Sequence, residues 1–140
     1  MKKLTFLIPV LAIAFLFSSC NDYGKKVKHG HIETFYKDGI TEAEAQHAAD
    51  LMYAMDANNA QTQKSFQLIK SNNVVHFRMV VNNDQIDKSM DINFLAISNV
   101  ISDSIFNGAP VDMDLTNNKF ELIRTLPYKK VTDEDFKNAN

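Results

Sequence analysis

Two stretches of the chain, residues 41–82 and 87–126, follow the same plan. Each begins with apolar residues at intervals of three and four, which is typical of one face of a helix. Each then continues with two alternating segments joined by an Asn-Asn pair, and asparagine tolerates the positive φ of a tight turn. Because a short turn joins antiparallel strands, the plan predicts a helix followed by a hairpin, twice over. The likeness fits an internal duplication, and it equally fits any chain with this order of elements.

The ends of both predicted helices carry recognisable signals. Thr41 and Glu44 fit a capping box at the start of a helix over residues 42–57. The second helix is predicted over residues 88–107, because Gly108 supplies a left-handed cap and a proline follows shortly after it. His47 lies beside the apolar face of the first helix, and we expect it to be partly buried.

Strands are predicted in two hairpins, with a weaker strand over residues 28–36 before the first helix. The resulting order is β-α-β-β-α-β-β. Two helices with one apolar face each need a sheet face to cover. We therefore predict an α+β two-layer sandwich with an antiparallel or mixed sheet and both helices on one face, either ferredoxin-like with an extra strand or an αββ-repeat variant. The strand residues predicted to face the helices are Phe66, Leu68, Phe77, Met79, Met113, Leu115, Phe120 and Leu122.

The first twenty residues have a separate character. Lys2 and Lys3 precede residues 4–17, which are apolar except for one threonine. As a helix this run would span ~21 Å, whereas crossing a bilayer requires ~30 Å. Its length is instead that of the core of a secretory signal. Two small residues, Ser18 and Ser19, then precede Cys20, the one cysteine of the chain.

The segment Leu16-Phe17-Ser18-Ser19-Cys20 resembles the cleavage site of bacterial lipoproteins, although that class more often has leucine where Phe17 stands. The resemblance implies that residues 1–19 are a signal peptide removed by the lipoprotein signal peptidase. It also implies that Cys20 receives diacylglyceride and becomes the mature N-terminus, held in a membrane of the bacterial cell envelope. Two or more acyl chains hold a protein firmly at a bilayer. The inner and the outer membrane both remain open.

The rest of the chain divides into three parts on composition. Residues 20–27 are predicted to form the lipidated cysteine and a short polar tether, residues 28–128 a single α+β domain, and residues 129–140 a polar C-terminal tail. The 15 basic and 17 acidic residues are nearly balanced, which argues against a nucleic-acid-binding protein.

Few residues form a pattern that carries chemistry. His29 and His31 are two residues apart, a spacing that binds a metal only if a third ligand joins them. They are therefore candidate metal ligands, and no cofactor is predicted. A lipidated Cys20 has no free thiol for redox or metal chemistry. The sequence has no G-x-S-x-G nucleophile motif and no glycine-rich phosphate loop.

The polar side of the predicted strands offers the remaining candidates. These residues alternate with the apolar ones and are expected on the sheet face away from the helices: Gln67, His76, Arg78, Asp112, Asp114 and Glu121. Such a face is either plain solvated surface or a moderately wet interface. Its candidate partner contacts are His76, Arg78 and Glu121.

Three functional hypotheses follow from these observations. The first is a non-enzymatic envelope lipoprotein that binds another protein or an envelope component. The second is a lipoprotein that binds a small ligand or a metal. The third is an enzyme whose site the sequence does not reveal.

Overall fold

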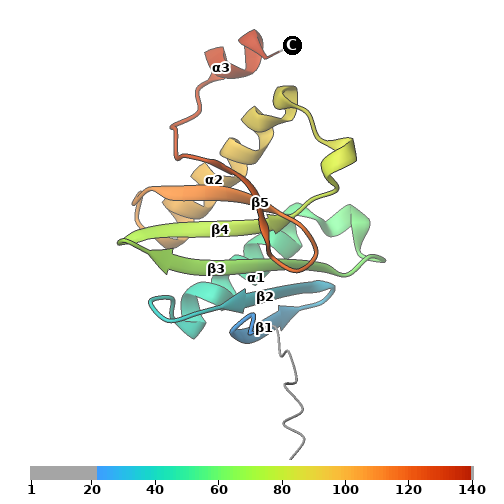
Figure 1. Cartoon of the computed structure of the whole chain (residues 1–140), viewed down its shortest axis with the longest axis vertical. Coiled ribbons are helices and arrows are strands. Elements are labelled where there is room, and N and C mark those ends of the chain that lie inside the picture. The colour runs from blue at the N-terminus through green and yellow to red at the C-terminus, as the bar shows by residue number, and fades with distance from the viewer. Residues whose placement is uncertain (1–21, 140) are drawn as a thin grey trace, which may run out of the picture.

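A computed structural model of the protein describes residues 22–139 (Figure 1). The predicted signal peptide and Cys20 lie outside the described residues. The elements are β1 (Lys25–His29), β2 (Ile32–Tyr36), α1 (Glu42–Met55), β3 (Lys64–Ser71), β4 (Val74–Val80), α2 (Asp91–Ile105), β5 (Val111–Thr116), β6 (Leu122–Leu126) and α3 (Asp133–Asn138). Short 3-10 turns cover Ala57–Asn59, Asn83–Gln85 and Lys88–Met90.

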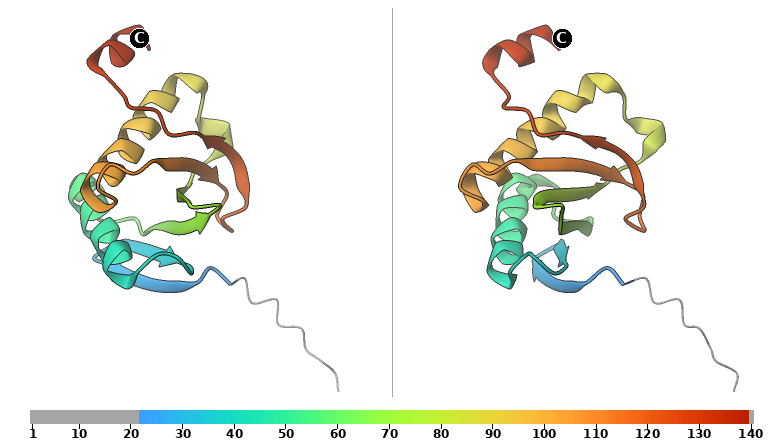
Figure 2. Two further views of the ribbon diagram at one scale, coloured as in Figure 1. Left: turned by 90° about the vertical axis from the view of Figure 1, so that its left-hand side faces the viewer. Right: turned by 60° about the vertical axis from the view of Figure 1, so that its left-hand side comes forward.

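The strands form one mixed sheet in the order β1-β2-β3-β4-β5-β6. The pairs β2–β3 and β4–β5 are parallel, and α1 and α2 connect them, while the other neighbours are antiparallel. Both long helices lie on one side of the sheet (Figure 2). The predicted α+β sandwich is therefore confirmed. Its sequential strand order fits the repeat variant, because a ferredoxin-like sheet splits each parallel pair with another strand.

The N-terminal part of the sheet differs from the prediction. The single strand expected over residues 28–36 is a hairpin that turns at Gly30, whose φ is +56°. A Cβ at Gly30 would lie 2.5 Å from the Tyr53 ring, so only glycine fits this turn. Because β1 begins at Lys25, residues 25–27 belong to the sheet and not to the tether.

The sequence did not predict this hairpin, because β2 buries polar residues on both of its faces and so lacks the alternation of apolar and polar residues. Glu33 is buried, and both Lys26 Nζ and Lys28 Nζ pair with its Oε1, at 3.0 and 2.9 Å. Burial alone would raise the pKa of Glu33, but the two ammonium groups bring that pKa below its ordinary value. Thr34, on the opposite face, lies within the core.

Several local signals in the rest of the chain are confirmed, but the tight turn predicted at Asn117-Asn118 is wrong. A longer connection over residues 117–121 joins β5 to β6, and the positive φ there belongs to Phe120. Thr41 and Glu44 form the capping box at the start of α1, with bonds of 3.2 and 2.7 Å. Asn72 and Asn73 have φ of 50° and 64°, the paired positive angles of a two-residue hairpin turn. Gly108, with φ of +81°, follows the end of α2.

The core lies between the helices and the sheet. Its fully buried members include Ile32, Leu68, Phe77, Ile101, Met113 and Leu115. Leu122 was expected there but is 54% exposed, because the β5–β6 register shifts at Leu115/Thr116 and Leu122 stands at the start of an edge strand. His47 is exposed rather than partly buried, since the small side chains of Ala45, Ala48 and Ala49 form the buried stripe of α1.

The C-terminal segment leaves the sandwich and ends in α3 (Figure 1). The side chain of the buried Asn99 fixes its path, since Nδ2 donates to the Lys129 carbonyl at 2.8 Å and Oδ1 accepts from Val131 N at 2.9 Å. The expected polar tail therefore begins with a segment docked on α2. No helix in the described part of the chain is long and apolar enough to cross a membrane.

Candidate functional site

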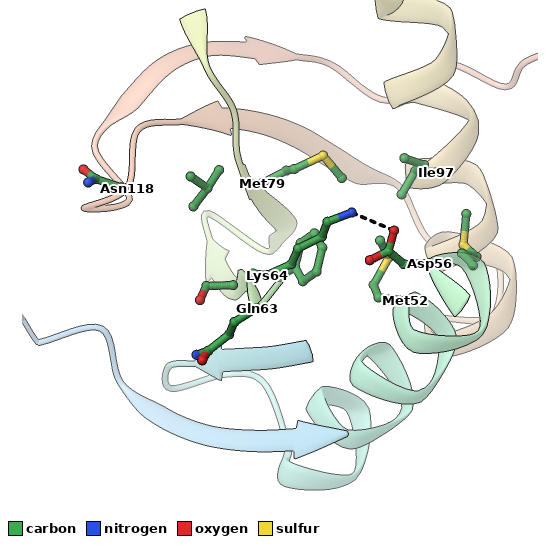
Figure 3. A pocket seen from close by; sticks show the side chains of 11 residues that line it. Met52, Asp56, Gln63, Lys64, Met79, Ile97 and Asn118 are labelled. Atoms are coloured by element: carbon green, nitrogen blue, oxygen red, sulfur yellow. Dashed lines mark hydrogen bonds and ion pairs between the residues drawn. The ribbon is translucent and has the colours of Figure 1, made fainter. Parts of the chain in front are cut away.

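A cleft of about 610 Å³ opens between the two layers, at the end where β3 begins and β4 ends (Figure 3). This volume is within the range of small-molecule sites. We call it the methionine-lined cleft. It is lined by Met52, Met55, Asp56, Gln63, Lys64, Ser65, Phe66, Met79, Val80, Ile97 and Asn118.

The walls of the methionine-lined cleft are mainly apolar. Met52 and Met55 come from α1, Ile97 from α2, and Phe66 and Met79 from the adjoining strands β3 and β4. Methionine side chains are flexible and polarizable, so they adapt to ligands of irregular shape. The cleft therefore suits an apolar molecule better than a sugar or a nucleotide.

One charged pair stands in this apolar setting. Lys64 Nζ lies 2.6 Å from Asp56 Oδ1, and Figure 3 shows the lysine reaching across the cleft toward that carboxylate. His31 Nε2 contacts the other carboxylate oxygen at 2.8 Å, and Asn59 Nδ2 donates to Oδ1 at 3.2 Å. The Lys64 ammonium, helped by His31 and Asn59 against the opposing effect of burial, lowers the pKa of Asp56 to about 2.

This arrangement leaves more hydrogen-bonding capacity on the lysine than on the carboxylate, which uses three of its roughly four acceptor sites. The two oxygens of Asp56 already have three partners among the described residues. An ammonium group has three N–H donors, and the bond from Lys64 Nζ to Asp56 uses one of them. The Lys64 side chain is 39% exposed, so it can offer a donor to a ligand in the cleft.

The candidate metal ligands, His29 and His31, flank the turn at Gly30 and meet on the ring of Tyr53. The His29 ring stacks on Tyr53 with centroids 4.1 Å apart, and the His31 centroid is 5.4 Å away. Each imidazole pairs with its own carboxylate, His29 Nδ1 with Asp50 Oδ1 at 2.7 Å and His31 Nε2 with Asp56. Within residues 22–139, no group of three or more His, Cys, Asp or Glu residues is placed to hold a metal ion.

The sheet face away from the helices, here called the outer face, carries a polar network. Asp114 is 2% exposed. Its carboxylate accepts hydrogen bonds from Arg78 Nε at 3.3 Å and Thr125 Oγ1 at 2.7 Å, and it lies 3.3 Å from His76 Nδ1. Gln67 is 1% exposed and accepts a bond from Arg78 Nη1 at 3.3 Å. The predicted contact residues His76 and Arg78 are therefore engaged within the domain.

Glu121, the third predicted partner contact, lies in a loop and not on a strand of the sheet. It is exposed in the connection between β5 and β6 (residues 117–121), where its Oε2 accepts a bond from Asn117 Nδ2 at 2.6 Å. Asn117 Oδ1 in turn accepts from the backbone N of Lys119 and of Glu121, at 2.9 and 3.0 Å. Glu121 thus stabilises its own loop and takes no part in the network around Asp114.

Three aromatic rings cover part of the outer face. Tyr23, Phe35 and Phe120 meet edge to face, with centroids 5.3–5.7 Å apart. Figure 1 views the sheet from this face, and the β5–β6 connection passes in front of it. Phe120, predicted to face the helices, is buried on this outer face instead and has a positive φ of 56°.

Beside these rings lies a hollow of about 220 Å³ lined by Asp22, Tyr23, Lys37, Gln67, Arg78, Lys119 and Phe120. We call it the basic hollow, because three of these side chains are cationic and one is a carboxylate. Lys37 and Lys119 are exposed and form no ion pair within the described residues. Sequence reasoning missed it because its residues come from five separate segments of the chain.

Comparison with known proteins identifies the domain. Residues 26–127 match the family model AF_1994_N, which is described as a family N-terminal domain. No curated protein and no solved structure matches the chain. The matched region runs from the second residue of β1 to the residue after β6, so it contains the six-stranded sheet except for Lys25, and both long helices. Because this match covers most of the sequence, the chain belongs to the AF_1994_N family.

Proposed function

We propose that this protein is a lipid-anchored protein of a bacterial cell envelope, and that its domain binds a small amphiphilic molecule in the methionine-lined cleft. It acts by binding and not by catalysis. The observation that carries the proposal is the combination of apolar walls with one charged pair. Such a site favours a ligand with an apolar body and a single polar end.

The free donors of Lys64 indicate the chemistry of that polar end. The Asp56 carboxylate already has three partners, so a cationic ligand would compete with them. A carboxylate on the ligand would instead accept from Lys64, and charge-assisted bonds of this kind are the stronger ones. The ligand that fits best is therefore a monocarboxylate with an aliphatic chain lying among Met52, Phe66 and Met79.

The anchor part of the proposal is supported by the sequence around Cys20. This residue follows an apolar run of signal-peptide length and two small residues. The first strand begins at Lys25, so only a few residues separate the sheet from the lipidated cysteine.

A role in binding another protein through His76, Arg78 and Glu121 has less support. Two of these side chains hold the buried Asp114, and the third braces a loop. Small-ligand binding is therefore preferred to the protein-binding hypothesis.

Calorimetry with decanoate and decanol tests the proposed ligand class on the mature chain carrying Cys20→Ser, which removes the lipid. We expect decanoate to bind, and decanol to bind more weakly. Lys64→Met should lower the affinity for decanoate about tenfold, the effect of losing one bond to a charged group. The affinity for decanol should not change.

A pair of tryptophan variants controls for nonspecific binding. Met55 and Leu122 are both about half exposed, at 48% and 54%, but only Met55 lines the cleft. Met55→Trp should therefore occlude the cleft and abolish binding, whereas Leu122→Trp should bind as wild type does. Equal binding by both variants, or no heat from either ligand with the wild-type chain, would refute the proposal.

A further inference from the structure

The path of the N-terminal segment places the basic hollow next to the predicted anchor. The Tyr23 ring packs on Phe35 and Phe120, and the Tyr23 carbonyl accepts a bond from Gln67 Nε2 at 2.8 Å. Cys20 precedes Tyr23 by three residues. Three residues span at most about 11 Å even when fully extended. A lipid-modified Cys20 would therefore hold this part of the outer face within about a Debye length of the membrane surface.

The basic hollow has cationic groups available for an anion. The Lys37 and Lys119 ammonium groups have no partner within the described residues. Asp114 and Gln67 hold Arg78 through Nε and Nη1, and its Nη2 forms no hydrogen bond within the described residues. Asp114 offsets the charge of Arg78, and Asp22 is the one carboxylate in the lining. The two lysines therefore make the net charge of the hollow positive.

We propose that the basic hollow binds the phosphate of an anionic phospholipid in the membrane that carries the anchor, so that the outer face of the sheet lies on the bilayer. This inference rests on the proposed lipidation of Cys20. Two lysines alone bind a bilayer weakly, but the anchor keeps the hollow at a high effective concentration of head groups. Binding of a head group in the basic hollow then orients the domain on the membrane, whereas the lipid anchor attaches it.

This orientation places the mouth of the methionine-lined cleft beside the membrane. Neighbouring residues of one loop line the two sites, Asn118 the cleft and Lys119 the hollow. On β3, Ser65 lines the cleft and Gln67 lines the hollow. Figure 3 shows Asn118 on the side of the cleft opposite Asp56 and Ile97. An amphiphile leaving the bilayer would therefore reach the cleft directly from its membrane-facing side.

The test measures orientation in the native lipidated protein reconstituted into vesicles. Because lipidation consumes the one natural thiol, an introduced cysteine is the one free thiol and takes a fluorescent label. Asn118→Cys reports the outer face, and Asn93→Cys on α2 reports the opposite layer. With nitroxide quenchers on the lipid head groups, we expect strong quenching at position 118 and little at position 93 in vesicles that contain phosphatidylglycerol, and weak quenching at both in pure phosphatidylcholine.

Charge variants with a matched control show whether the hollow is responsible. The double variant Lys37→Gln/Lys119→Gln should have a ratio of membrane-docked to undocked domains about 25-fold lower than wild type. Each lysine near a charged surface contributes about fivefold. Lys88→Gln with Lys137→Gln removes the same charge elsewhere and should leave quenching unchanged. Equal loss from both pairs, or equal quenching at positions 118 and 93, would overturn the proposal.

Two further measurements distinguish binding of free phosphate from binding of lipid, and failure of the anchor from failure of the hollow. If inorganic phosphate releases the labelled loop more effectively than sodium chloride of equal ionic strength, the hollow takes free phosphate and the lipid proposal is wrong. If the protein is absent from the vesicles and its Cys20 thiol reacts with the label, the anchor has failed. That result differs from an anchored protein whose label at position 118 is not quenched.

Discussion

The side-chain amide of Gln67 donates a hydrogen bond to the backbone carbonyl of Tyr23 at 2.8 Å, and it thereby ties the N-terminal segment to the middle of the sheet. Gln67 is almost fully buried, and its oxygen accepts from Arg78. One side chain therefore links the predicted tether, the aromatic rings of the outer face and the network around Asp114. The direction in which the chain leaves the domain depends on this residue.

Replacing Gln67 with alanine should destabilise the fold and release the N-terminal segment. The change leaves a carbonyl and a guanidinium without their partner, and buried groups left in this way cost about 1–3 kcal/mol. Denaturant unfolding measures the loss, and hydrogen exchange should show faster exchange near Tyr23. The exposed Gln61 provides the control, since Gln61→Ala should change neither quantity. A Gln67→Ala chain as stable as wild type would show that the bond has no structural role.

Asp56→Asn should weaken the protein at neutral pH and have no effect in strong acid. The pKa of this carboxyl is lowered from 3.8 to about 2, chiefly by Lys64. A lowered pKa means that the ionised form stabilises the fold, fully above pH ~4 and progressively less as pH falls toward ~2. We expect a loss on the order of 1–2 kcal/mol at pH 7.

Thermal unfolding of Asp56→Asn and wild type from pH 7 to pH 2 checks this expectation. The two curves of stability against pH should converge at the acid end. Asp84→Asn, at an exposed position whose side chain has no polar partner within residues 22–139, should follow wild type throughout. Curves that remain parallel would rule out the ion pair as the source of the difference.

Thr34→Val should stabilise the protein by about 1 kcal/mol, because it removes a buried hydroxyl and keeps the shape of the side chain. Thr34 is fully buried, and its Oγ1 has no hydrogen-bond partner in the part of the chain that the structure describes. Thr116 is the matched control, since it is equally buried but donates to the Met79 carbonyl at 3.1 Å. Thr116→Val should therefore destabilise. Chemical denaturation of both variants measures the contrast, and changes of the same sign would contradict it.

Asn99→Ala should free the C-terminal segment without unfolding the sandwich. The Asn99 amide holds Lys129 O and Val131 N, while the core side chains of α2 are unaffected. Limited proteolysis should cut within residues 129–138 faster in the variant, with the melting temperature lowered by only a few degrees. Asn93→Ala on the exposed side of α2 should be cut as slowly as wild type. Unchanged cleavage of Asn99→Ala would show that other contacts hold the segment.

The sequence predicted those features that local residues determine. The Thr41–Glu44 capping box involves four residues, and the Asn72-Asn73 turn needs only the tolerance of asparagine for positive φ. The layered fold follows from the apolar faces of two helices and the alternation of the strands. These signals are read correctly because no distant contact is needed to produce them.

The cleft and the basic hollow depend on contacts that no local pattern contains. Met52, Met79 and Ile97 meet only because β4 and the two helices pack together. Asp114 alternates as a solvent-facing residue would, yet it is buried because Arg78, His76 and Thr125 surround it. Leu115 and Thr116 carry no sequence signal for the shift in register that exposes Leu122.

The most direct test of the account is mass spectrometry of the mature protein isolated from its native membrane. The account predicts an N-terminal peptide that begins at Cys20 and carries diacylglyceride on its sulfur. An unmodified thiol at Cys20, or a mature chain that begins elsewhere, would contradict the proposed location of the protein and with it the orientation inferred for the domain.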